Sequence, residues 1–155
     1  DDNNRNIYGA FKISSEFLIK NYCNLKGISL NICRVFNIYG KDDKFSILQK
    51  LKNVKKNNHK IQIYNKGLSK RDFIHVDDVV KIYIKILKNI SGSGIYDVGT
   101  GKGISIIEII NKLKLNKKKL IYKKKIINEI SDSVADNKNL LKKIKGINFK
   151  RIENV

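Results

Sequence analysis

The chain has 155 residues, of which 41% are apolar, so it is long enough for one domain, or a piece of one, with a buried core. Its net charge is +19, yet the cations are 29 lysines and only four arginines. Because arginine is the preferred residue for bidentate contacts with phosphates and base edges, this balance argues against a nucleic-acid partner. No apolar run reaches about 18 residues, so we expect no membrane partner either.

The first predicted element is a helix at residues 8–25, where apolar side chains recur every three or four positions and Gly27 follows as a stop. The next run, ISLNICRVF at 28–36, is short and rich in β-branched residues. This composition predicts a single buried strand. A turn at 41–44 then leads to a helix predicted at 45–56.

The rest of the chain alternates between short apolar runs and amphipathic stretches. We predict strands at 61–64 and 94–98, an extended segment at 71–76, helices from 77 to about 91 and from 105 to 113, and weaker strand candidates at 120–122 and 133–135. Strands that alternate with helices indicate an α/β fold, here the latter part of a parallel sheet with an attached small lobe.

Cysteine and histidine are both scarce. Cys23 and Cys33 are too few for a disulfide scaffold, and with His59 and His75 they match no zinc-site spacing. We therefore expect no metal site, packed roles for both cysteines and for His75, and a reducing, cytoplasmic location. The start DDNNRN is unlike a signal peptide, and the absence of methionine leads us to expect that the chain begins inside a longer protein.

Two glycines form part of a dinucleotide-binding pattern. Gly99 and Gly101 lie between a predicted strand and a predicted helix, which is the right context for such a loop. However, the third glycine would fall at Ile104, and Lys117 stands about twenty positions on, where an acidic residue is needed. We therefore interpret these glycines as parts of a tight turn at the sheet edge.

Tyr8 and Lys12 lie four residues apart in YGAFK, so they share one face of the predicted helix. There the ammonium can favour an ionised phenol and donate hydrogen bonds to a cofactor hydroxyl, while the phenol exchanges a proton with a substrate hydroxyl. The spacing alone proves little in a lysine-rich chain, because Tyr22 and Lys26 repeat it. A tyrosine beside a solvated lysine is the structural alternative.

Four motifs occur in a characteristic order. YGAFK is followed by Glu16, then by ISLNICRVFNIYG, by RDFIHVDDVV, and by IYDVGTG before a helix. In this order they resemble the extended short-chain dehydrogenase/reductase family, in particular its NAD-dependent nucleotide-sugar epimerases and dehydratases. The resemblance covers residues 8–113 and is weaker in SVADNKNLLKKIKG near the end.

The resemblance implies a Rossmann-type fold and a role for each matching residue. Tyr8 would be the catalytic acid/base and Lys12 its helper, both in contact with a bound NAD or NADP. Phe36 and Asn37 would line the substrate side, with Asn37 near the diphosphate of a nucleotide sugar. Arg71 would bind that diphosphate with its planar guanidinium. The implied reaction is transient oxidation at a sugar carbon by an epimerase or 4,6-dehydratase, which we expect to be a homodimer when full length.

Structural roles stay open for several of these residues. Asn37 could form a turn after the strand, and Arg71 could pair with Asp72 or Asp77. Asp77 and Asp78 suit the start of a helix, where the helix dipole favours negative charge.

The family's dinucleotide-binding half has no counterpart in this sequence. We therefore interpret residues 1–155 as the C-terminal portion of one Rossmann-type domain with its substrate-binding lobe, and expect this portion alone to be inactive. Lys41 stands where the family usually has a proline after Gly40. A carbonyl reductase of the same family and a non-catalytic basic binding module remain as alternatives.

Overall fold

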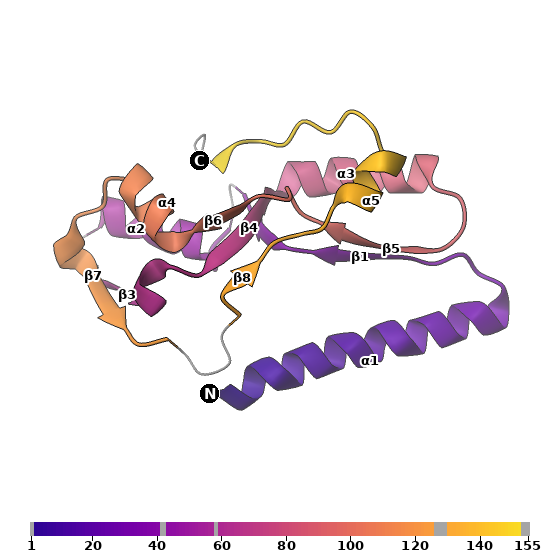
Figure 1. Cartoon of the computed structure of the whole chain (residues 1–155), viewed down its shortest axis with the longest axis horizontal. Helices are drawn as coiled ribbons and strands as arrows, with labels where there is room; N and C mark the ends of the chain where they lie inside the picture. Colours follow the sequence, from indigo (N-terminus) through magenta and orange to yellow (C-terminus); the bar gives the residue numbers. More distant parts are fainter. Residues whose placement is uncertain (1, 41–42, 58, 126–129, 153–155) are drawn as a thin grey trace.

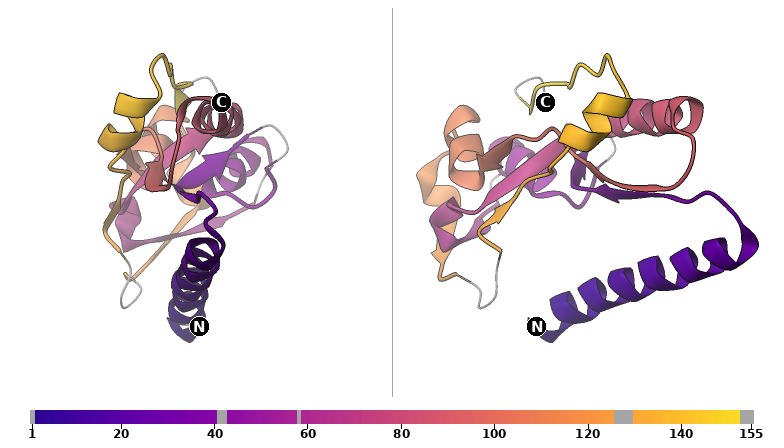
Figure 2. Two further views of the ribbon diagram at one scale, coloured as in Figure 1. Left: turned by 90° about the vertical axis from the view of Figure 1, so that its right-hand side faces the viewer. Right: turned by 45° about the vertical axis from the view of Figure 1, so that its right-hand side comes forward.

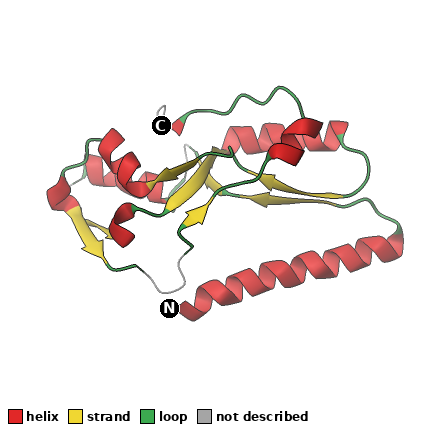
Figure 3. Ribbon diagram, in the orientation of Figure 1, coloured by secondary structure: helices red, strands yellow, loops and turns green. Residues whose placement is uncertain are grey.

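The computed structural model describes residues 2–40, 43–57, 59–125 and 130–152, with side chains described from residue 7 onward. Its alternating helices and strands confirm the α/β class (Figure 3). The helices are α1 (Asp2–Lys26), α2 (Ile47–Lys56), α3 (Val76–Asn89), α4 (Ile106–Lys112) and α5 (Lys138–Lys143). The strands are β1 (Asn31–Val35), β2 (Asn37–Tyr39), β3 (Ile61–Tyr64), β4 (Lys70–His75), β5 (Gly94–Val98), β6 (Gly103–Ser105), β7 (Leu120–Lys123) and β8 (Asp132–Ser133).

Helices lie on both sides of the β1–β5 pair. α1 runs along one side, whereas α3 and α5 cover the other (Figures 1 and 2). α1 is followed by Gly27, whose φ of 64° lies in the left-handed region that glycine adopts without strain. The predicted helix is therefore present, and it begins at Asp2 instead of Tyr8.

The segment 28–36, predicted as one strand, contains the single strand β1, and the next strand, β2, begins just after it in a different sheet. β1 pairs in parallel with β5, from Asn31 opposite Gly94 to Val35 opposite Val98. The N–H of Phe36 donates a hydrogen bond to the carbonyl oxygen of Val98 at 3.0 Å. The chain then leaves this sheet, and strand β2 pairs with β4. The prediction that this strand is buried was wrong, because β1 is half-buried with Arg34 exposed, and its other edge has no partner strand among the described residues.

β4 is the central strand of the four-stranded sheet. It pairs in parallel with β2 and β8 and antiparallel with β6, while β3 and β7 form a separate parallel pair near α2 and α4 (Figure 1). The strands predicted at 61–64 and 94–98 have the predicted bounds. β6 was not predicted, because three residues are too few to show an alternating pattern.

Apolar side chains of the described residues form one core on each side of β4. Phe73 belongs to the first core and Ile74 to the second, because successive residues of a strand point to opposite faces. The first core joins α2, β3, α4 and β7 through Leu48, Leu51, Ile63, Ile109, Ile110 and Leu120. The second joins α3, β5 and α5 through Val79, Ile82, Ile86, Tyr96, Val98 and Leu140.

Capping side chains shift two helix starts by one or two residues from the prediction. The Ser46 hydroxyl accepts a hydrogen bond at the first turn of α2, so this helix begins at Ile47 and not at Phe45. The Nδ1 of His75 accepts the N–H of Asp77 at 3.1 Å, so α3 begins one residue earlier than predicted.

The tail has more structure than its lysine-rich sequence indicated. The strand candidate at 133–135 is β8, which lies slightly earlier, and α5 was not predicted. The turn predicted at 41–44 lies partly outside the described residues, and Lys41 is one of the residues that are not described. No helix in the described ranges is long and apolar enough to cross a membrane.

Candidate functional site

Two of the predicted substrate residues lie where the chain passes from β1 to β2. Asn37 is the first residue of β2, so it lies in a strand and not in a turn. Its side-chain amide donates to the carbonyl oxygen of Asp72 at 3.0 Å, which ties β2 to β4. Phe36 and Asn37 line a cavity of about 360 Å³, here called the strand-junction cavity, together with Arg34, Val35 and Ser133.

Arg71, the third predicted substrate residue, lies on β4 and is half-buried. Its Nη1 donates to the carbonyl oxygens of Lys70 at 2.8 Å and Ser131 at 3.3 Å. Arg71 and Asn37 both line a second cavity of about 340 Å³, here called the arginine cavity, beside β3. The fold thus brings to one cavity two residues that lie far apart in the sequence.

Tyr8 and Lys12 lie on α1. The Lys12 ammonium is 5.5 Å from the centre of the Tyr8 ring, and Tyr8 is 66% exposed. Neither residue lines the strand-junction cavity or the arginine cavity. The two side chains therefore contact each other as their spacing predicts, and their relation to the substrate residues depends on how α1 is attached.

An ion pair attaches α1 to the sheet. Arg34 of β1 donates from Nε to one carboxylate oxygen of Glu16 at 2.8 Å and from Nη2 to the other at 2.7 Å. These hydrogen bonds from Arg34 are the largest cause that lowers the pKa of Glu16. These two hydrogen bonds tie α1 directly to strand β1. The motif contained Glu16, but its partner could not be read from the sequence.

Asp72 is a fully buried carboxylate that sequence reasoning did not assign to the site. It accepts hydrogen bonds from the backbone N–H groups of Thr100 at 2.9 Å, Gly101 at 2.8 Å and Ala135 at 3.2 Å, and from the Thr100 hydroxyl at 2.6 Å. Two amides of the glycine-containing loop therefore bind a carboxylate of this chain instead of a phosphate. This contact supports the interpretation of the loop as a structural turn.

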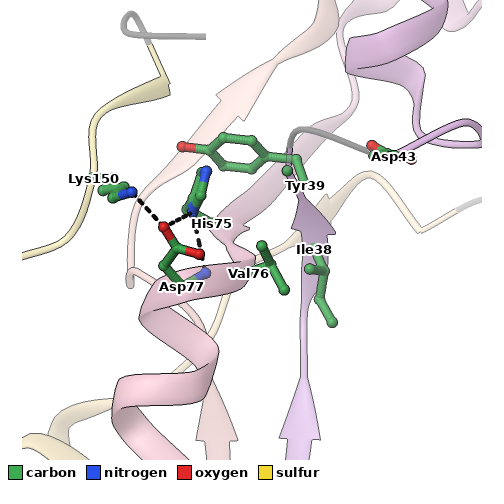
Figure 4. Close-up of a pocket in the computed structure, with 8 residues that line it drawn as sticks. Ile38, Tyr39, Asp43, His75, Val76, Asp77 and Lys150 are labelled. Atoms are coloured by element: carbon green, nitrogen blue, oxygen red, sulfur yellow. Dashed lines mark hydrogen bonds and ion pairs between the residues drawn. The ribbon is translucent and has the colours of Figure 1, made fainter.

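A cavity of about 760 Å³ lies at the start of α3 (Figure 4). There the Asp77 carboxylate pairs with the Lys150 ammonium, which is the main cause that lowers the pKa of Asp77. The buried Asp78 carboxylate accepts the N–H of Lys150 at 2.7 Å. His75 packs edge-to-face against Tyr39 with 5.1 Å between ring centres, and burial raises the pKa of Tyr39. These contacts join the C-terminal segment to α3, which agrees with structural roles for both aspartates.

No group of three or more metal-ligating side chains that could hold a metal ion occurs in the part of the chain that the structure describes.

The candidate site consists of two parts. One is the exposed Tyr8–Lys12 face of α1, and the other is the pair of cavities that Asn37 shares with Phe36 and Arg71.

Residues 1–99 match the model of the NAD dependent epimerase/dehydratase family. The chain therefore belongs to this family of enzymes, and the resemblance drawn from its motifs is confirmed.

Two curated relatives illustrate the range of the family. The chain is 31% identical over 112 residues to a dTDP-D-glucose 4,6-dehydratase of Dictyostelium discoideum, which covers 72% of this chain and 26% of the relative. It is 34% identical over 110 residues to a UDP-glucuronate 4-epimerase of Thermodesulfobacterium geofontis, which covers 69% of this chain and 33% of the relative. The chain thus spans about a quarter to a third of the length of these relatives.

Comparison with solved structures supports the Rossmann-type fold. The crystal structure of a dTDP-glucose 4,6-dehydratase from Streptomyces venezuelae, with NAD bound, superposes with a TM-score of 0.78 and 19% sequence identity. The match covers 93% of this chain and 46% of that one. At this level of identity the likeness concerns the fold.

Proposed function

We propose that the complete protein is an NAD-dependent nucleotide-sugar epimerase or 4,6-dehydratase. The observation that carries this proposal is the cavity shared by Asn37 and Arg71, because an amide and a planar guanidinium suit the oxygens of a diphosphate. The names of the two curated relatives, a dehydratase of a dTDP sugar and an epimerase of a UDP sugar, support the same substrate class. In this proposal Phe36 lies on the sugar side, in the strand-junction cavity.

The residues of α1 fit the ribose of a nicotinamide cofactor. The Lys12 ammonium has three N–H donors and the Tyr8 phenol can donate or accept, and both side chains are exposed and adjacent. Tyr8 and Lys12 would hold NAD, which supplies the hydride acceptor for oxidation at a sugar carbon when it is bound. The amides of Thr100 and Gly101 are not available for its phosphates, because they bind Asp72.

Proton transfer is the role proposed for Tyr8. Its phenol would take the proton of the sugar hydroxyl at the carbon being oxidised and return a proton later in the cycle. Lys12, whose ammonium lies beside the Tyr8 ring, places a positive charge next to the phenol while the proton moves. Asn37 and Arg71 would hold the diphosphate and thereby orient the sugar toward this face.

The proposed catalytic role predicts that Tyr8→Phe lowers kcat of the complete protein by at least about a hundredfold, because the phenylalanine ring cannot exchange a proton. Binding of the nucleotide sugar, measured by calorimetry, is expected to survive. Tyr22→Phe is a matched control, because Tyr22 and Lys26 have the same spacing on the same helix. Equal turnover in the Tyr8 and Tyr22 variants would refute the assignment.

We also propose that the complete protein is a homodimer that uses the outer face of α1. Phe11, Leu18, Tyr22 and Leu25 are 70%, 67%, 58% and 85% exposed. They lie on one face of the helix, because they follow the i, i+7, i+11, i+14 pattern. This face is interrupted only by Ser14 and Ser15, and a second copy that presents the same face would cover its exposed apolar side chains symmetrically.

A further inference from the structure

We infer that the ion pair of Glu16 and Arg34 positions the catalytic face of α1 against the strand junction between β1 and β2. This inference rests on the proposed function, because it gives the two residues a positioning role in that reaction. Arg34 lines the strand-junction cavity, whereas Glu16 lines neither that cavity nor the arginine cavity, so Glu16→Gln is the variant that tests positioning alone.

The first step concerns α1. Tyr8, Lys12 and Glu16 follow one another at four-residue spacing, so they lie along one face of the helix. With a rise of about 1.5 Å per residue, Lys12 lies about 6 Å and Tyr8 about 12 Å from Glu16 along the helix axis. The carboxylate that is bound to the sheet therefore belongs to the same face as the proposed catalytic pair.

The second step concerns β1. Phe36 and Asn37 follow Arg34 by two and three residues, which is about 7 Å and 10 Å along an extended chain. α1 and β1 run in opposite directions (Figure 1). Moving back along α1 from Glu16 and forward along β1 from Arg34 therefore leads toward the same end of the molecule. The catalytic pair and the strand junction lie on the same side of the ion pair, at comparable distances.

The third step concerns the geometry of the pair. Both carboxylate oxygens of Glu16 are bound by separate nitrogens of Arg34, and such a fork restrains sliding and rotation of the helix more than a single point charge can. Asp97 lies opposite Arg34 in the parallel register of β1 and β5 and adds a second negative charge near the guanidinium. A slip of α1 by one turn would move Tyr8 by about 5.4 Å.

Arg34→Lys tests this inference in the complete protein, because lysine keeps the charge and loses the fork. We expect kcat to fall by about tenfold to a hundredfold, which is typical when a reacting group is misplaced by about 1 Å. KM for the nucleotide sugar should change by less than about threefold, and the pH profile of kcat should keep its shape, because Tyr8 and Lys12 stay together on one helix. Glu16→Gln should behave alike, and the double variant should be no worse than either single variant.

Hydrogen exchange of the α1 amides provides a readout that does not depend on activity. We expect faster exchange in both variants, because α1 loses two hydrogen bonds that tie it to β1. Arg151→Lys, the same chemical change at an exposed arginine, is the matched control and should leave exchange and kinetics unchanged.

Unchanged exchange and kcat in Arg34→Lys would overturn the inference. So would a merely structural effect, in which melting temperature falls and the loss of activity follows the fraction of unfolded protein. If the unaltered protein turned over no nucleotide sugar, the proposed function would fail. Exchange would then still test whether the pair holds α1 in place.

Discussion

Asp72 is the residue on which three separate parts of the chain converge. Its carbonyl oxygen holds the side chain of Asn37, and its carboxylate holds the backbone at Thr100, Gly101 and Ala135. It also lies next to Arg71, so both proposed diphosphate-binding residues depend on the same short piece of β4. A buried carboxylate is stable here because several hydrogen-bond donors compensate its loss of water.

Replacing that carboxylate by an amide should therefore be costly. In Asp72→Asn one oxygen becomes an NH₂ group, which faces N–H donors and leaves at least one of them without an acceptor. We expect the free energy of unfolding to fall by about 3 kcal/mol, measured by urea unfolding. The exposed Asp132→Asn is the control and should change it by less than about 0.5 kcal/mol. Equal effects of the two substitutions would show that the carboxylate is not needed.

At the scale of elements, side-chain caps define where helices begin. α4 starts with a capping box in which the Ser105 hydroxyl accepts the N–H of Glu108 at 3.3 Å, while the Glu108 carboxylate accepts the N–H of Ser105 at 2.8 Å. The sequence signal for this box, a serine followed three residues later by a glutamate, is short-range, although the helix predicted at 105–113 did not rest on it.

The capping box predicts a specific dependence on pH. The hydrogen bond from the Ser105 hydroxyl is the largest cause that lowers the pKa of Glu108 below its ordinary value. The stabilisation by the carboxylate is therefore complete above the unfolded pKa and is lost as the pH falls through the lower folded pKa.

Glu108→Gln should accordingly destabilise the protein at about pH 7 and much less at about pH 3, as measured by urea unfolding at both values. Ser105→Ala removes the box from the other side and should cost about 1 kcal/mol at neutral pH. A penalty for Glu108→Gln that is the same at both pH values would show that the ionised carboxylate is not what stabilises α4.

At the scale of the whole molecule, α1 matters because many of its apolar side chains are exposed in the described chain. One face carries the ion pair to the sheet, and the opposite face is the exposed apolar stripe that we propose as a dimer interface. A homodimer that uses this stripe should be weakened by a charged residue near its centre, because two copies would meet there.

Leu18→Lys should therefore shift the complete protein from dimer toward monomer in sedimentation experiments. Its circular dichroism should stay unchanged, because Leu18 is 67% exposed and contributes little to the described cores. Ile95→Lys, a similar change at a partly exposed residue on β5, is the control for the added charge. Dimers that persist in Leu18→Lys would place the interface elsewhere.

Local patterns in the sequence were sufficient for the class of fold and for the individual motifs. The helix at α1, the strands at 61–64 and 94–98 and the Tyr8–Lys12 contact all depend on residues near one another in the chain. The strand predicted at 28–36 is present as β1, but apolar runs do not reveal where that strand ends and the chain changes its partner strand. The roles of Tyr8, Lys12 and the substrate residues stay predictions.

The sequence by itself determined the helical and strand periodicities, the order of the motifs and hence the family. Tertiary structure alone decided that Asn37 and Arg71 share a cavity, that Glu16 meets Arg34, and that one carboxylate organises loop 99–101 and the segment after β8. The physical reason is range. Periodicity and capping act within a few residues, whereas each of these contacts joins positions that only the pairing of strands and the packing of α1 bring together.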